Sequence, residues 1–87
     1  MEGLETAINE RVSFLKEQIN PQNKPLVNRA FEIQIETIRA ADTEGIAIQI
    51  LRKQKQLEKA KDLDMIETLY TKLEALEWLQ RQVVKFI

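Results

Sequence analysis

The hydrophobic residues of this 87-residue chain recur every three or four positions, which is the spacing of one face of an α-helix. Four segments carry the pattern, at about residues 4–19, 25–41, 44–61 and 65–86. Asn20-Pro21 ends the first segment, because the residue before a proline is disfavoured in the helical region and proline donates no backbone hydrogen bond. The pattern predicts an all-α fold, a small antiparallel bundle of four helices forming a single domain over residues 1–87.

The segment 25–41 has the widest hydrophobic surface. Its hydrophobic residues cover more than half of the helix circumference, whereas a surface helix needs a stripe only about 100° wide. We therefore expect it to be the central helix and to contact at least two others. Asn23 is its predicted N-cap, and Pro25 falls in its first turn, where a missing N–H costs nothing.

The last segment carries hydrophobic residues at a spacing close to the heptad repeat of packed helices. These residues are Ile66, Leu69, Leu73, Leu76, Val83 and Ile87. Tyr70, Leu79, Val84 and Phe86 widen this seam, whereas Trp78 points to nearly the opposite side. Asp62-Leu63-Asp64 marks the boundary with the segment before it, and one continuous helix over both segments is an open alternative.

The composition excludes several kinds of chemistry. The chain has no His, no Cys and one serine, Ser13, so it lacks the commonest general base, the best nucleophile and the usual transition-metal ligands. We expect no enzymatic activity, no cofactor and no metal site. The N-terminus lacks a signal-peptide pattern and no stretch reaches the ~18 uninterrupted apolar residues of a membrane span, so we expect a cytoplasmic protein without a transmembrane segment.

Trp78 directs the functional interpretation towards protein binding. Tryptophan is enriched at interaction hot spots because it buries a large area with few rotatable bonds. The outer faces of the first and last predicted helices then form the candidate partner-binding surface. Its residues are Phe14, Trp78, Leu79 and Phe86, with Arg81 and Lys85 as a polar rim. A second interpretation, equally open at this stage, places Trp78 in the core.

The leading hypothesis is a non-catalytic protein-binding module, such as a small adaptor, inhibitor or regulatory protein, with a partner that the sequence does not identify. A domain of this length buries only ~60 to 65% of its unfolded surface, so association adds useful stability. We therefore also expect a homo-oligomer, in its simplest form a homodimer.

The alternative is a nucleic-acid-binding regulator that uses the basic face of the third predicted helix. That face consists of Arg52, Lys53, Lys55, Lys59 and Lys61. Cations at this spacing can contact phosphates, but no aromatic residue lies between them to stack on bases. The 13 basic residues almost cancel the 14 acidic ones, and a net charge of −1 gives no overall attraction for nucleic acid. Nucleic acid is therefore the less favoured partner.

Overall fold

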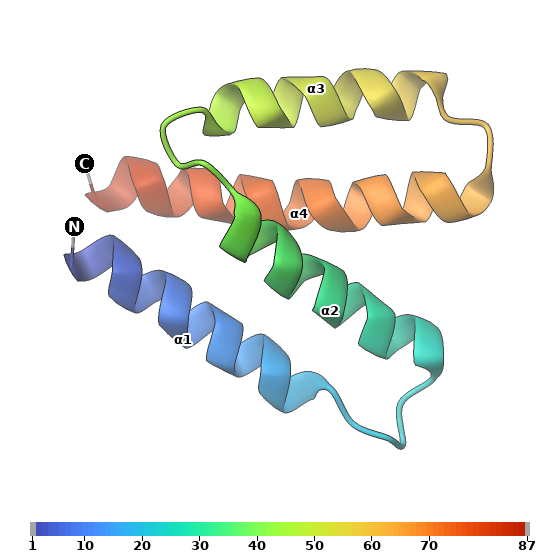
Figure 1. Cartoon of the computed structure of the whole chain (residues 1–87), viewed down its shortest axis with the longest axis horizontal. Coiled ribbons are helices and arrows are strands. Elements are labelled where there is room, and N and C mark those ends of the chain that lie inside the picture. The colour runs from blue at the N-terminus through green and yellow to red at the C-terminus, as the bar shows by residue number, and fades with distance from the viewer. Residues whose placement is uncertain (1, 87) are drawn as a thin grey trace.

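The computed structural model describes residues 2–86 and consists, over that range, of four α-helices joined by short connections (Figure 1). They are α1 (Glu2–Gln18), α2 (Pro25–Ala40), α3 (Ile46–Lys59) and α4 (Leu63–Phe86). The predicted all-α bundle of four helices is confirmed, and each predicted helix end lies within two residues of the observed one. Ile87, which was predicted to end the seam of the last helix, lies outside the described residues.

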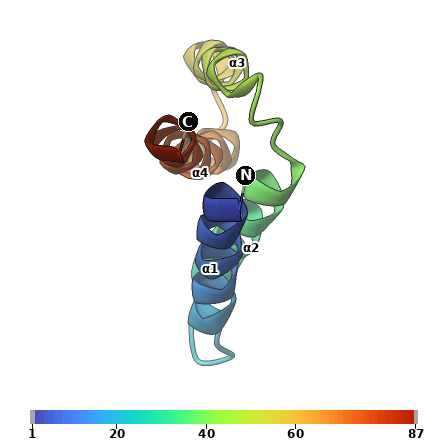
Figure 2. The same ribbon diagram turned by 90° about the vertical axis from the view of Figure 1, so that its left-hand side faces the viewer.

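The helix on which the others pack is α4. It contacts α1, α2 and α3, whereas α3 contacts α4 alone among the described helices. In the side view, α4 lies between α3 and the α1–α2 pair (Figure 2). The expectation that the segment 25–41 touches two neighbours is confirmed, by α1 and α4, but the expectation that it is the central helix is wrong.

The difference follows from length and from where the hydrophobic residues end up. At 24 residues, α4 is longer than α2 by two turns and buries residues along most of its length. In α2, only Ile35 and Ile38 are buried, while Leu26 and Val27 at its start remain exposed. The wide hydrophobic surface of α2 is therefore only partly used in packing.

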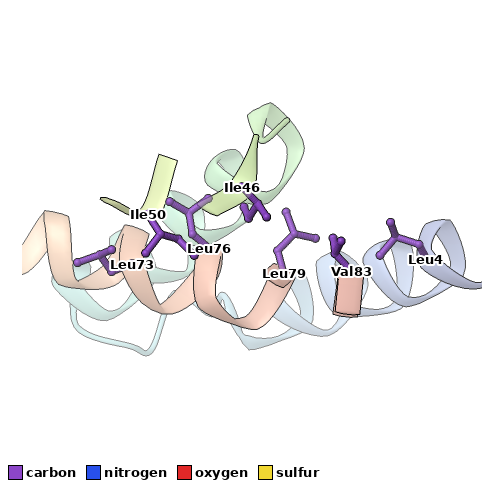
Figure 3. Packing of buried hydrophobic residues seen from close by; sticks show 7 residues of the cluster. All are labelled: Leu4, Ile46, Ile50, Leu73, Leu76, Leu79 and Val83. Carbon is purple, nitrogen blue, oxygen red and sulfur yellow. The ribbon is translucent and has the colours of Figure 1, made fainter. Parts of the chain in front are cut away.

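Two hydrophobic clusters form the core, and α4 contributes to both. The first, here called the α3–α4 cluster, is drawn in Figure 3 and contains Leu4, Ile46, Ile50, Leu73, Leu76, Leu79 and Val83. The second, here called the α1–α2 cluster, contains Val12, Leu15, Ile35, Ile38 and Ala75. Ile8 and Trp78 are partly buried and pack against both clusters, so the two clusters are joined along α4.

The chain reverses between α3 and α4, so the alternative of one continuous helix is not adopted. Ala60 takes an extended conformation (φ −72°, ψ 135°), which ends α3. The Asp62 side chain then accepts a hydrogen bond from the backbone N–H of Asp64 at 3.3 Å, at the start of α4. This reversal allows Ile46 and Ile50 to fold back onto α4.

The connection between α1 and α2 is held by asparagine side chains. Asn28 accepts hydrogen bonds from the backbone N–H of Asn20 at 3.2 Å and from the Asn23 side chain at 3.0 Å. Asn23 also donates to the carbonyl of Gln18 at 2.8 Å, at the end of α1. The prediction that Asn23 caps α2 is therefore wrong: its amide satisfies a free carbonyl of the preceding helix instead. Pro25 does begin α2, as predicted.

The two ends of the described chain lie side by side (Figures 1 and 2). A Cβ atom on Gly3 would lie 2.8 Å from Cδ1 of Phe86, which is closer than carbon atoms normally approach. Gly3 thus allows the ring of Phe86, at the end of α4, to pack directly on the start of α1.

Leu79 is completely buried (0% exposed), so its removal leaves a cavity at the centre of the α3–α4 cluster. We expect Leu79→Ala to lower the free energy of unfolding by about 3 kcal/mol. The matched control Leu26→Ala, at a position 66% exposed, should change it by less than about 0.5 kcal/mol. Urea unfolding followed by circular dichroism measures both, and equal effects of the two substitutions would contradict this packing.

Candidate protein-binding surface

Among the helices of residues 2–86, none covers one side of α4. Its buried residues pack on α3 and on Leu4 of α1 in one cluster, and on α1 and α2 in the other. Tyr70 and Val84 point away from both, with exposed fractions of 57% and 72%. They are 14 residues apart, so they lie on one side of the helix, and Glu77 lies midway between them.

We call this surface the outer face of α4. It consists of Glu67, Tyr70, Glu74, Glu77, Arg81, Val84 and Lys85, all of them exposed. Glu74 is held from the side by Gln34 of α2, whose side-chain amide donates a hydrogen bond at 3.2 Å. The outer face therefore combines two exposed hydrophobic side chains with a row of charges.

A small aromatic group adjoins the outer face. The guanidinium carbon of Arg11 lies 5.5 Å from the ring centre of Phe14 and 5.4 Å from that of Trp78. Both distances fall within the range of cation–π contacts. Phe14 is 48% exposed, while Trp78 is half-buried against both core clusters.

The predicted partner-binding residues divide into three sets. Phe14, Arg81 and Lys85 are exposed, as a binding surface requires. Trp78 and Phe86 are half-buried and pack against the core, so each combines a packing role with a partly accessible surface. The prediction that Leu79 binds a partner is wrong, because its side chain is fully buried and not accessible to another protein.

Tyr70, Val84 and Arg11 belong to the candidate surface but were not predicted from the sequence pattern. That pattern assigned Tyr70 and Val84 to the hydrophobic seam, because their helical positions are adjacent to it. Spacing alone does not separate them from the core seam, although charged residues such as Glu77 lie between them on the helix surface. The contact of Arg11 with Trp78 joins two helices and has no signature within either one.

The five cations proposed for nucleic-acid contact do not form one surface. Arg52, Lys55, Lys59 and Lys61 are exposed, but Lys53 is half-buried and lines a groove between α2 and α3. Ile48 and Leu51 share the exposed side of α3, with exposed fractions of 57% and 51%. Exposed hydrophobic residues of this kind contribute nothing to phosphate contacts, whereas they are typical of protein–protein interfaces.

The groove lies between α2 and α3, which do not contact each other, and α4 forms its floor. Two hollows of about 300 and 570 Å³ meet at Lys72. Cations such as Lys53 and Lys59 line it together with anions such as Glu36 and Asp62. This mixed lining selects no single class of ligand by charge. The ion pair at one end, Arg29 with Asp64 at 3.4 Å, is largely exposed and therefore adds little stability.

Within residues 2–86, no group of three acidic side chains lies close enough to hold a metal ion. None of the described helices combines the length and the apolar character needed to cross a membrane. Comparison of the chain with known protein families, curated proteins and solved structures finds no match in any of the three.

The cation–π contact of Arg11 predicts a measurable contribution to stability. Because the guanidinium lies over both aromatic rings, we expect Arg11→Gln to lower the free energy of unfolding by about 1 kcal/mol. Trp78 is the only tryptophan, so its fluorescence emission should shift in the same variant.

Lys16→Gln, on the exposed side of the same helix, is the control and should leave both quantities nearly unchanged. Identical stability and emission of the Arg11 variant and the native chain would show that the contact does not persist in solution.

Proposed function

We propose that this chain is a non-catalytic protein-binding module, and that it binds its partner through the outer face of α4 and the adjoining Arg11–Phe14–Trp78 group. An adaptor, an inhibitor and a regulatory protein all act in this way. A cytoplasmic location is part of the proposal, because a chain without Cys needs no oxidising compartment to fold.

The observation that carries the proposal is the amount of exposed surface. The accessible surface is 6271 Å², whereas a compact monomer of this length exposes about 5,300 Å². The shape explains the surplus, since the Cα positions span 37 × 34 Å but only 16 Å in the third direction. The surplus of roughly 970 Å² is of the order of the ~800 Å² that each partner contributes to a typical protein–protein interface.

The composition of the surface supports the same function. Tyrosine, tryptophan and arginine are the residues most enriched at interaction hot spots, and Tyr70, Trp78 and Arg11 lie on or beside the outer face. The flanking charges provide specificity, because a partner must match them in sign. Self-association is one form of this activity, in which the partner is another copy of the chain.

A photo-crosslinking amino acid at position 70 tests the proposal directly. When the full chain carries p-benzoylphenylalanine in place of Tyr70 in its native host, we expect illumination to give one crosslinked species of defined mass. The reason is that a bound partner lies within a few ångströms of this exposed ring.

The matched control carries the same amino acid at Gln56, which is also exposed but lies on α3 and lines the groove instead of the outer face of α4. The crosslinked species should be absent from this control. If position 70 gives no crosslink either, or only the same products as position 56, the outer face of α4 is not a binding surface.

A further inference from the structure

The charges on the outer face of α4 are separated by sign along the helix. Glu67 and Glu74 precede Glu77, while Arg81 and Lys85 follow it. Two such helices side by side in parallel would place like charges opposite each other. In the antiparallel direction, the acidic half of each helix lies against the basic half of the other, which is the favourable arrangement.

The hydrophobic residues select a register for the antiparallel pair. Tyr70 and Val84 each lie seven residues from Glu77. If two copies cross antiparallel about a two-fold axis at Glu77, Tyr70 of each copy lies opposite Val84 of the other. Both residues are more than half exposed in the single chain, and the two symmetric contacts would cover all four side chains.

The same register also pairs the charges. Glu74 lies three residues before Glu77 and Arg81 four residues after it, so they come opposite each other to within one residue. Glu67 lies ten residues before Glu77 and Lys85 eight residues after it, so these two side chains are offset by two residues. Offsets of about 1.5 to 3 Å along a helix are within the reach of these long side chains.

We propose that the protein bound at the outer face of α4 is a second copy of this chain, packed antiparallel across a two-fold axis at Glu77. This inference rests on the proposed protein-binding function and names its partner. The accessible surface of the whole chain, 6271 Å², exceeds that of a compact monomer of this length by more than the ~800 Å² that each half of a typical dimer buries. A self-complementary surface patch is also what a two-fold dimer requires, because the same residues serve on both sides.

Cysteine crosslinking tests both the partner and the direction of packing, and the chain has no native Cys to interfere. Two variants of the full chain are made, Tyr70→Cys and Val84→Cys. In the antiparallel dimer, position 70 of one copy lies near position 84 of the other, whereas two copies of either position are about 21 Å apart. A disulfide needs Cα atoms within ~7 Å.

We therefore expect mild oxidation to give a disulfide-linked dimer from the mixture of the two variants and little from either variant alone. Analysis of intact mass then shows which cysteines are joined. Dimers from the single variants, or none from the mixture, would overturn the proposed packing.

Charge reversal provides an independent test by sedimentation equilibrium. Reversing only the basic pair, Arg81→Glu with Lys85→Glu, leaves all facing charges negative, so we expect the dissociation constant of the dimer to rise about tenfold or more. Adding Glu67→Lys and Glu74→Lys restores opposite charges across the axis, and should restore the dimer. Circular dichroism confirms that each variant is folded, and a quadruple variant that stays dissociated while folded contradicts the register.

Substitution of Glu77 should change the dissociation constant of the dimer in the opposite direction. In the proposed dimer, the two copies of Glu77 meet at the axis and repel each other, so Glu77→Gln should tighten the dimer several-fold. A dimer weakened by this substitution would place the axis elsewhere.

The two proposals fail in different ways. If the chain remains monomeric in these experiments but crosslinks to another protein at position 70 in its host, the protein-binding function is supported and the proposed homodimer is wrong. If the chain remains monomeric and gives no crosslink at position 70, both the protein-binding function and the homodimer are contradicted.

Discussion

Burial of α4 on two of its sides is the interaction on which this fold depends. Leu73, Leu76 and Val83 cluster with Ile46 and Ile50 of α3 and with Leu4 of α1, and Ala75 packs with residues of α1 and α2. Both contacts are needed for the fold. Among the described helices, α3 packs on α4 alone, and without α4 the pair α1 and α2 would be only a helical hairpin. The clusters are small, so the chain depends on a few fully buried side chains such as Leu15, Leu76 and Leu79.

The same constraint determines where a binding surface remains. Three helices cover two sides of α4 and leave the third to solvent, so that side carries charges together with Tyr70 and Val84. Because the Cα positions span only 16 Å in one direction, against 37 and 34 Å in the others, a broad part of the molecular surface lies open for contact. The exposed pair on α3, Ile48 and Leu51, shows that one side of this helix too is left uncovered by the rest of residues 2–86.

The spacing of hydrophobic residues was sufficient to predict the positions of the helices, but not to predict which helices pack against each other. Proline and the spacing of hydrophobic residues located all four helices, because these signals are local. Helix α4 is hydrophobic over so much of its circumference that spacing alone could not separate buried Leu79 from exposed Tyr70 and Val84. That distinction depends on where α3 and the α1–α2 pair pack, which is a long-range property. Asn23 was misassigned for a similar reason, since its hydrogen bonds reach back to Gln18 and forward to Asn28.

Isotope-filtered nuclear Overhauser spectroscopy on an equal mixture of labelled and unlabelled chain tests the central claim most directly, because it detects contacts between copies alone. The account predicts an intermolecular signal between the ring protons of Tyr70 and the methyl groups of Val84, and none between the two copies of Tyr70 or the two copies of Val84. A concentrated sample that gives no signal between Tyr70 and Val84 of different copies would contradict it.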